Sequence, residues 1–550
     1  MAKSDLRIDI LGTVITISTD EESEYLKKLL DKYRQTIENV QRMSGLKDPL
    51  KTAILTGFLL CDDLEKATAS SGNKTAHITG EEAGEAEKLT LGLISLLDEA
   101  LKVSDSSSDN SIEESETPVP QKTPPAEPPL VYKLQNTVKN YAWGSAEWLP
   151  AFLGQKNLSR IPWVELWMGV NPAGPSRVVS DSSGSLSGEE TLLLPELIEQ
   201  DPPAFLGKEI AESFGKLPFL LKVEAAAKPL SIQAHPNLDQ AREGFDRENR
   251  EGKSPDAPDR NYHDANHKPE IMCALSPFAA LCGFRNAGEI KTLIGLLSRG
   301  YMQGNDGALK LGFESLVSAL EREDENPLKA FLAALFSLGT EAREALGLFI
   351  KARRSLLERD FPEYRDEWEL CAYLASLYPG DPGIIAPLYL NIVELAPGEA
   401  MYLPAGVFHA YLHGMGVELM ADSDNVLRGG LTPKHVDVDE LFRILIFSEY
   451  KPEILKVPSP APFWYSYPTP TREFTFSFLH SSGEAVPYPE TGPSIVLITE
   501  GSATVTENSG ETLLVKGESA FIPAGEKAGL TFSGTFTAYV AACAASCRSS

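Results

Sequence analysis

The segment that decides the fold is PLYLNIVELAPGEAMYLPAGVFHAYL, residues 387–412. Short runs of aliphatic, aromatic and β-branched residues alternate there with Pro and Gly, which is typical of strands joined by tight turns. The segments PFLLKVEAAAKPLSIQAHP (218–236) and SIVLITEGSATVTEN (494–508) have the same character. This pattern predicts a mainly β architecture for the larger part of the chain.

Two segments within this region are similar to one another: GEAMYLPAG at 398–406 and GESAFIPAG at 517–525. Each follows two strand-like runs and suits a turn that leads into a strand of a jelly-roll barrel, so we expect two cupin-like jelly-roll barrels. Between the strand-rich ends, apolar residues recur at helical spacing and predict a helical insertion. The expected layout is a catalytic barrel over 130–286 and 379–450, the helical insertion over 287–378, and a second barrel over 451–550.

A change in composition separates a small N-terminal module from this region. Residues 103–129 are rich in Ser, Glu and Pro, which predicts a disordered linker. Before it, LRIDI and TVITIST flank Gly12 as a predicted β-hairpin, and apolar residues at helical spacing follow. We expect residues 1–102 to form an α+β module with long helices. Because such a module has little core of its own, we expect it to self-associate, with a plain globular cap as the alternative.

Composition and charge restrict the partners. The formal net charge of −28 argues against nucleic acid and anionic membranes, because a polyphosphate surface would be repelled. The 6 cysteines form no CxxC pair, as expected in a reducing compartment. We expect a cytoplasmic protein, since no apolar leader opens the sequence and no apolar run reaches the ~18 residues of a membrane-spanning helix.

Polar side chains gather on one face of the predicted strand SIQAHP. Side chains two residues apart share a face of a strand, so Ser231, Gln233 and His235 point to the same side. Glu270 opens the strand EIMCAL, and His409 lies on a third strand. Imidazole, carboxylate and amide groups suit Zn²⁺ with a position left open for water or substrate. The pattern alone leaves a metal-free polar strand face as the alternative.

The large module resembles type I mannose-6-phosphate isomerases over nearly its full length. The matching segments are NYAWG (140–144), WVELWMGVNPAGPS (163–176), LPFLLKV (217–223), KPLSIQAHP (228–236), NHKPEI (266–271), GFR (283–285), LPAGVFHAYLHG (403–414) and DNVLRGGLTPKHVDV (424–438). The resemblance implies an enzyme that interconverts mannose 6-phosphate and fructose 6-phosphate by zinc-assisted proton transfer. It implies one Zn²⁺ per chain, held by Gln233, His235, Glu270 and His409. The second barrel has no histidine from Ser481 to Ser550, so we expect it to be metal-free and structural.

Moving a proton between two adjacent carbons requires a base and a stabilised enolate-like oxygen. The resemblance places Arg428 at the catalytic position, where a guanidinium suits an electrophile but not a base. We expect Asp424 and Lys434 to act beside it. The proton carrier stays open among Asp424, Glu418, Lys268 and a zinc-bound hydroxide. The resemblance implies a cis-enediol route, with a hydride shift as the alternative, and a structural Asp424–Arg428 ion pair is the other interpretation of those two residues.

A phosphate substrate in so acidic a protein requires a local group of cations. The expected substrate-binding residues are Lys222, Ser231, Lys268, Tyr411 and Glu418. The position of Glu418 depends on a predicted hairpin. If its loop spans 413–416, Glu418 opposes Tyr411 and shares the face of His409, whereas a shorter loop turns it away. The resemblance predicts the first register.

The small module resembles the ZapA family of bacterial cell-division proteins. The residues that carry this resemblance are RIDILGTVITIS, EYLKKLLDKYRQTIE and DPLKTAILTGFLLCDDL. It implies association through coiled coils and binding to the tubulin-like division protein. The whole chain is therefore expected to be a homo-oligomeric isomerase, with an inactive sugar-phosphate sensor coupled to cell division as the alternative and tethering of an isomerase to the division apparatus as a third possibility.

Overall fold

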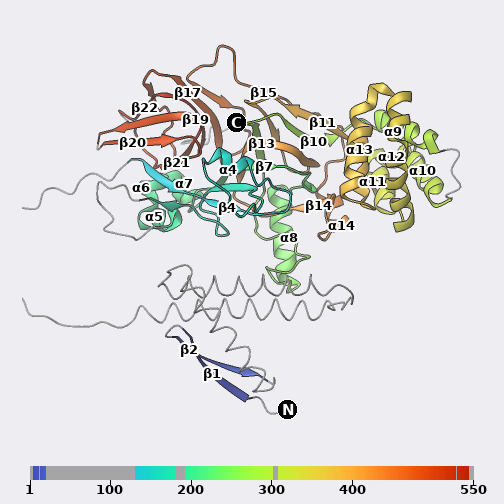
Figure 1. Ribbon diagram of the computed structural model, residues 1–550, viewed down its shortest axis with the longest axis horizontal. Coiled ribbons are helices and arrows are strands. Elements are labelled where there is room, and N and C mark those ends of the chain that lie inside the picture. Colours follow the sequence, from blue (N-terminus) through green and yellow to red (C-terminus); the bar gives the residue numbers. More distant parts are fainter. Residues whose placement is uncertain are drawn as a thin grey trace, which may run out of the picture. The chain divides into compact units, whose positions relative to one another are not determined.

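The computed structural model describes residues 4–10, 13–19, 130–179, 192–301, 307–508, 510–527 and 529–543 (Figure 1). The chain divides into two compact units, Met1–Lys122 and Thr123–Ser550. In the first unit, β1 (Ser4–Ile10) and β2 (Thr13–Thr19) pair antiparallel at the position of the predicted hairpin. The helices and linker expected over residues 20–129 lie outside the described residues. No helix in the described ranges is long and apolar enough to cross a membrane.

The second unit is built on two antiparallel sheets. The first sheet has 11 strands, and seven of them follow the order β15-β12-β9-β13-β7-β5-β4. The strands of this sheet are β4 (Thr137–Lys139), β5 (Glu165–Gly169), β7 (Phe219–Ala226), β8 (Ile232–Ala234), β9 (Glu270–Ala274), β10 (Phe278–Phe284), β11 (Leu390–Leu395), β12 (Glu399–Leu403), β13 (His409–Ala421), β14 (Leu427–Gly430) and β15 (Leu455–Lys456).

The second sheet has 10 strands, with the main order β16-β17-β23-β19-β21-β3-β6. Its strands are β3 (Tyr132–Gln135), β6 (Arg177–Val178), β16 (Trp464–Tyr467), β17 (Thr475–Ser482), β18 (Val486–Pro487), β19 (Ser494–Glu507), β20 (Gly510–Val515), β21 (Ser519–Ile522), β22 (Thr531–Ser533) and β23 (Thr535–Ala542). The prediction of a mainly β fold is confirmed for this unit.

One part of the expected domain layout needs correction. β3 and β6 were assigned with residues 130–286 to the first barrel, but β3 pairs with β21 and β6 pairs with β3 in the second sheet. These strands are short, and their sequence does not indicate which of the two sheets they join. The chain therefore begins this unit in one sheet and enters the other at β4.

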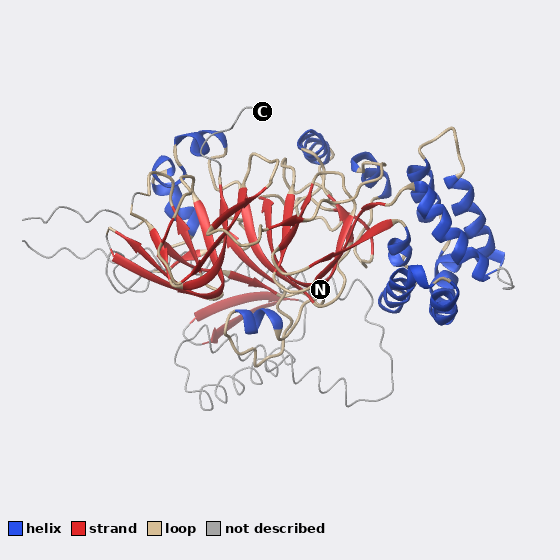
Figure 2. Cartoon of the chain, turned by 90° about the horizontal axis from the view of Figure 1, so that it is seen from above, coloured by secondary structure: helices blue, strands red, loops and turns tan. Residues whose placement is uncertain are grey.

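Helices lie mainly between β10 and β11 and form a bundle at one end of the sheets (Figures 1 and 2). This bundle consists of α9 (Ala287–Tyr301), α10 (Gly307–Leu320), α11 (Pro327–Phe336), α12 (Thr340–Asp360) and α13 (Arg365–Leu377), with the 3₁₀ segments Pro362–Tyr364 and Pro382–Leu388. The remaining helices are α4 (Trp148–Phe152), α5 (Leu194–Gln200), α6 (Pro202–Leu206), α7 (Lys208–Ser213), α8 (Leu238–Arg250) and α14 (Val438–Ile444). Trp368 of α13, which is fully buried, belongs to the apolar core of the bundle.

Alternation of side chains along the central strands of the first sheet separates a dry face from a polar one. Phe219, Leu221 and Val223 of β7 join an apolar core that also contains Phe476 and Tyr539 of the second sheet. Residues on the same face of β5, β9 and β13 enter this core too, among them Leu166, Ile271, Cys273, Val417 and Leu419. Burial of this face against the second sheet leaves the opposite face for polar groups.

The sequence prediction of a hairpin after His409 is wrong. β13 runs without a turn from His409 to Ala421, pairing with β10 at its start and with β7 from Gly414 onward. A bulge opposite Ala279 and Ala280 places one extra residue in β13, which reverses the parity of the strand beyond it. Glu418 therefore shares the face of Tyr411 through a bulge rather than through a four-residue loop.

A hydrogen bond between His267 and Glu473 fastens the segment before Glu270 to the segment before β17. Nε2 of His267 lies 2.8 Å from Oε1 of Glu473, and the hydroxyl of Thr471 donates to the same carboxylate. Burial would raise the pKa of Glu473, but the hydrogen bonds from His267 and Thr471 lower it to about 2. A carboxyl with a lowered pKa stabilises the fold at higher pH and loses that contribution as it becomes protonated.

The variant Glu473→Gln should lower the free energy of unfolding by about 1–3 kcal/mol at neutral pH, because it removes a charged hydrogen-bond acceptor. The difference from the wild type should persist above the ordinary glutamate pKa of 4.5 and shrink as the pH falls from 4.5 toward 2. Urea unfolding across this pH range measures it. A pH-independent difference, or one equal to that of the exposed control Glu484→Gln, would contradict the assignment.

Candidate active site

Three side chains converge on the polar face of the first sheet. His235 follows β8, Glu270 begins β9 and His409 begins β13, and one ligand atom of each lies within 4.8 Å of the others. Nε2 of His235 is 3.5 Å from Oε1 of Glu270, and Nε2 of His409 is 3.4 Å from Oε2. Atoms bound at ~2.0 Å to one tetrahedral ion lie ~3.3 Å apart, so this spacing fits a shared metal.

Hydrogen bonds orient both imidazoles. Nδ1 of His235 donates to the carbonyl of Asn425 at 2.7 Å, and Nδ1 of His409 donates to the carbonyl of Val407 at 2.9 Å. Since a carbonyl can only accept, each ring carries its proton on Nδ1 and presents the lone pair of Nε2 toward Glu270. This arrangement is the one that metal-ligating histidines adopt.

The polar atoms at the centre of the cluster make no hydrogen bonds. Nε2 of His235, Nε2 of His409 and both carboxylate oxygens of Glu270 are buried without a hydrogen-bond partner. Burial lowers the pKa of His235 to about 3. Burial alone would raise the pKa of Glu270, but the ammonium group of Lys268, 3.1 Å away, helps to hold it well below its usual value. Neutral imidazoles and an ionised carboxylate are the states that a divalent cation requires, so the residues fit a metal.

Gln233, the fourth predicted ligand, lies on β8 between two other predicted site residues. It is opposite His409 on one side and opposite Arg428 of β14 on the other. Its side chain lines the same cavity as Glu270. Two nitrogens, a carboxylate and an amide oxygen form a donor set that suits Zn²⁺.

A cavity of about 650 Å³ opens beside this cluster. Every residue predicted to be catalytic or substrate-binding lines it, namely Lys222, Ser231, Lys268, Tyr411, Glu418, Asp424, Arg428 and Lys434. His235 and His409 do not line the cavity and are only 2% and 1% exposed. The structure therefore brings the predicted residues together from three regions far apart in the sequence, 222–235, 268–270 and 409–434.

A buried network connects Lys222, Tyr411 and Glu418. Nζ of Lys222 lies 2.8 Å from Oε2 of Glu418, and the hydroxyl of Tyr411 donates to Oε1 of the same carboxylate at 2.8 Å. Burial would lower the pKa of Lys222, but Glu418 and Glu165 raise it well above its usual value. Lys222 therefore stays charged inside the cavity wall.

The segment RGGLTPK is held in a strained turn that brings Arg428 and Lys434 to the cavity. Leu431 has a φ of 54°, and its backbone N–H donates to Oδ1 of Asp381 at 2.8 Å. A side chain on Gly429 would meet the ring of Phe408 at 2.1 Å, so only glycine fits there. Strain of this kind persists where the surrounding structure holds a functional segment in place.

Arg428 is not neutralised by an acidic neighbour. Burial is the only cause that lowers its pKa, and the described residues contain no carboxylate that acts on its guanidinium. The alternative of a structural Asp424–Arg428 ion pair is therefore not supported. Burial and the charge of Arg428 lower the pKa of Lys434. The two cations form a local positive site in an acidic chain, as an anionic substrate group requires.

Part of the cavity wall was not predicted from the sequence. Glu165, Trp167 and Glu224 line it, as do Tyr141 and Trp143 at its rim, whose rings stack with centroids 5.8 Å apart. Strand parity would have found some of them, because Glu224 lies two residues after Lys222 and Glu165 two residues before Trp167. Tyr141 and Trp143 lie between β4 and β5, outside any strand, so strand alternation could not have predicted them.

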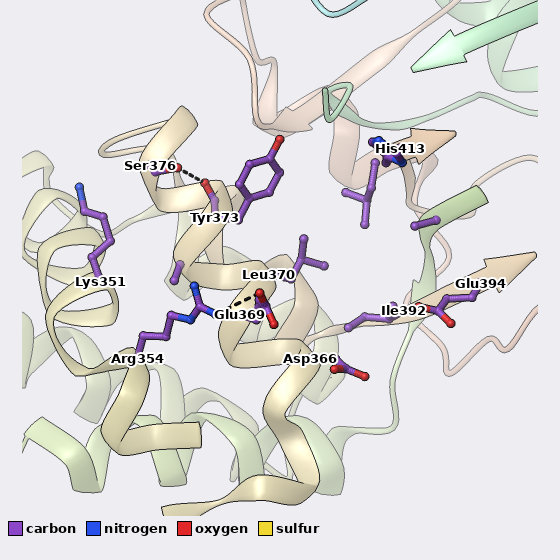
Figure 3. Close-up of a pocket in the computed structure, with 13 residues that line it drawn as sticks. Lys351, Arg354, Asp366, Glu369, Leu370, Tyr373, Ser376, Ile392, Glu394 and His413 are labelled. Carbon is purple, nitrogen blue, oxygen red and sulfur yellow. Dashed lines mark hydrogen bonds and ion pairs between the residues drawn. The ribbon is translucent and has the colours of Figure 1, made fainter. Parts of the chain in front are cut away.

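A second cavity, of about 710 Å³, lies between α12, α13 and the edge of the first sheet (Figure 3). Its charged groups are partly paired with one another, as Arg354 is with Glu369 at 3.0 Å. His413 points toward this cavity, and its ring packs edge-on against Trp148. Within the described ranges, the metal-ligating group formed by His235, Glu270 and His409 lies elsewhere, so we place the chemistry in the first cavity.

The antiparallel sheets and the buried His–Glu–His cluster beside a charged cavity define a metal-dependent enzyme of the mainly β class. Comparison with known proteins assigns the class more closely. The family model "Phosphomannose isomerase type I, catalytic domain" matches residues 131–287, and the model "Cell division protein ZapA" matches residues 6–115.

Relatives cover nearly the whole second unit. The chain is 40% identical to the mannose-6-phosphate isomerase of Escherichia coli over 397 residues, which is 72% of this chain and 95% of the relative. It is 35% identical to mannose-6-phosphate isomerase 2 of Arabidopsis thaliana, over 72% of this chain and 89% of that protein. The crystal structure of the Salmonella typhimurium enzyme bound to fructose 6-phosphate and zinc is similar with a TM-score of 0.66 and 35% identity, covering 76% of this chain and 100% of that one.

The chain belongs to the type I mannose-6-phosphate isomerase family and carries a ZapA-like region at its N-terminal end. Both resemblances expected from the sequence are confirmed. The ZapA match extends to residue 115, beyond the module boundary expected at residue 102 and into the predicted linker. That boundary was placed by composition, which changes before the family similarity ends.

The variant Glu270→Gln should reduce bound zinc from about one ion per chain to near zero, because it removes the only anionic donor of the cluster. Metal analysis after gel filtration measures the stoichiometry. The matched control Glu394→Gln, at an exposed position of β11, should keep its zinc. Unchanged zinc content in Glu270→Gln would contradict the site.

Proposed function

We propose that the chain catalyses the reversible isomerisation of mannose 6-phosphate and fructose 6-phosphate, with one Zn²⁺ held by Gln233, His235, Glu270 and His409. The observation that carries this proposal is the buried His–Glu–His cluster, whose facing atoms make no hydrogen bond, next to a cavity that contains uncompensated cations. Zinc, when bound, supplies Lewis-acid stabilisation of the oxygen that becomes negative during enolisation.

The chain's own residues divide the remaining tasks. Arg428 and Lys434 supply positive charge for the substrate phosphate and for the developing enediolate. Ser231 lies on the same side of its segment as Gln233 and lines the cavity, so its hydroxyl is available to the phosphate. Lys268, which lines the cavity and lies 3.1 Å from Glu270, adds a further charge.

We propose Asp424 as the proton carrier. Glu418 has both carboxylate oxygens in hydrogen bonds with Lys222 and Tyr411, so both are already engaged within the cavity wall. Lys268 is paired with Glu270. Asp424 lines the cavity, and its backbone N–H donates to Oδ2 of Asp264 at 2.8 Å, while its carboxylate makes no hydrogen bond with the described residues. A fixed backbone with an available carboxylate is what a general base requires.

The proposed layout assigns different roles to the two sheets. We propose that each closes as a cupin-like jelly-roll barrel, with the first catalytic and the second metal-free and structural. Residues 481–550 contain no histidine, which supports the second assignment. The helical segment between β10 and β11 would then be an insertion in the catalytic barrel.

A coupled assay for fructose 6-phosphate formed from mannose 6-phosphate tests the proposed reaction. Activity should disappear with a chelator and return with zinc. Arg428→Ala should lower kcat about 100-fold or more, because a charge opposite the transition state is lost, while zinc content stays unchanged. The control Arg359→Ala, on an exposed position of α12, should behave as the wild type.

Two results would contradict this account. Loss of zinc in Arg428→Ala would make Arg428 a structural residue. Binding of zinc and substrate without any turnover in the wild type would favour the alternative, an inactive sugar-phosphate sensor coupled to cell division.

We propose that the ZapA-like region makes the enzyme a homo-oligomer and binds the tubulin-like division protein. The family match over residues 6–115 supports this proposal, as does the division of the chain into separate compact units. Coupling through this region would place a sugar-phosphate isomerase at the division apparatus.

Sedimentation velocity should show an oligomer for the full chain and a smaller species for the chain that lacks residues 1–122. The full chain should also co-sediment with filaments of the division protein, and the truncated chain should not. Equal oligomeric states of the two chains would exclude self-association through this region, and equal co-sedimentation would exclude its role in filament binding.

A further inference from the structure

Glu224 is a buried carboxyl group in the cavity that the proposed mechanism does not use. It lies on β7 two residues after Lys222, so both side chains face the cavity. Its neighbours on the adjacent strands are Glu165 of β5 and Gly416 of β13. The residue is only 2% exposed, and its Oε1 has no hydrogen-bond partner in the described structure.

The other unpartnered polar atoms of this site have an explanation that Glu224 lacks. Those of His235, Glu270 and His409 surround the proposed metal position, and Glu224 is not part of that group. A buried oxygen without a hydrogen bond destabilises the protein, so such atoms are rare unless a ligand or water satisfies them. Because Glu224 lines the cavity, a bound substrate is in a position to form the missing hydrogen bond.

The charges around Glu224 define which substrate group it can accept. Glu418 on β13, Glu165 on β5 and Glu270 on β9 act on it as negative charges, and Lys222 on β7 is the positive one. Burial, together with Glu418 and Glu165, raises the pKa of Glu224 well above its usual value. Such surroundings repel a phosphate dianion but suit a neutral hydroxyl, with which a carboxyl group can form a hydrogen bond.

The chemistry of the substrate limits which hydroxyl is involved. The reaction takes place at C1 and C2, which must lie next to the metal cluster. The phosphate on C6 requires the cations Arg428 and Lys434, and neither of these acts on Glu224. The C5 hydroxyl of the open-chain sugar adjoins the carbon that carries the phosphate and therefore lies near those cations. The hydroxyls on C3 and C4 remain, and they lie between the reacting carbons and the phosphate.

We propose that Glu224 is a specificity-determining residue that hydrogen-bonds the C3 or C4 hydroxyl of the bound sugar phosphate. This inference rests on the proposed isomerase function. A cavity with a buried hydrogen-bonding group discriminates against analogues that lack the matching hydroxyl, since the group is then left without a partner. Glu224 thereby favours sugar phosphates with a hydroxyl at that carbon over deoxygenated ones.

The test compares the wild type, Glu224→Leu and Glu224→Gln on mannose 6-phosphate and on its 3-deoxy and 4-deoxy analogues. Glu224→Leu should lower kcat/KM for mannose 6-phosphate about tenfold, mainly through KM. For the analogue that lacks the contacted hydroxyl, Glu224→Leu and the wild type should have equal values. Glu224→Gln, which keeps a hydrogen-bonding group of the same length, should restore kcat/KM to within about threefold of the wild type.

Zinc content and the control Glu394→Leu, on the exposed face of β11, show whether an effect is specific, and both should match the wild type. Calorimetric binding of mannitol 6-phosphate and its deoxy forms repeats the comparison without turnover. Loss of activity in the wild type would overturn the proposed function, and this binding comparison would still test Glu224. If Glu224→Leu changes no substrate, or changes all three equally, or if Glu224→Gln loses as much as Glu224→Leu, Glu224 makes no such contact.

Discussion

The structure depends on the alternation of side chains along four neighbouring strands, β5, β7, β13 and β9. The side chains on one face of these strands pack into an apolar core shared with the second sheet. Those on the other face include Glu165, Lys222, Glu418 and Glu270, which line the cavity. Burial of the dry face fixes the register, because a slip of one residue would exchange the two faces. The second sheet therefore stabilises the site without contributing a proposed metal ligand, because it covers the apolar face of these four strands.

Some charged side chains of the cavity are paired with one of opposite charge, and others are not. Glu418 is satisfied by Lys222 and Tyr411, whereas Arg428 keeps its positive charge and the cluster around Glu270 keeps its lone pairs. The unpaired groups are those that zinc and a sugar phosphate would satisfy. An acidic chain of net charge −28 can accordingly hold an anionic substrate through a few local cations.

Strand patterns and family motifs allowed the mainly β fold and the residues around the cavity to be predicted, because both depend on local alternation and on segments such as SIQAHP. These patterns did not predict the features that depend on pairing between strands distant in sequence. The short strands β3 and β6 join the second sheet, and a bulge in β13 rather than a hairpin brings Glu418 beside Tyr411. Glu224 was overlooked for a different reason: its neighbours on β5 and β13 are distant in sequence, so the missing hydrogen bond of its Oε1 is visible only in the folded chain.

One zinc ion should bind on the polar face of the first sheet, next to the cavity. Diffraction from zinc-loaded crystals on both sides of the zinc absorption edge would locate this ion. We expect one anomalous peak per chain, bonded to Nε2 of His235, Nε2 of His409, Glu270 and Gln233. A peak at any other group of side chains, or none in this cluster under zinc-saturated conditions, would contradict this expectation.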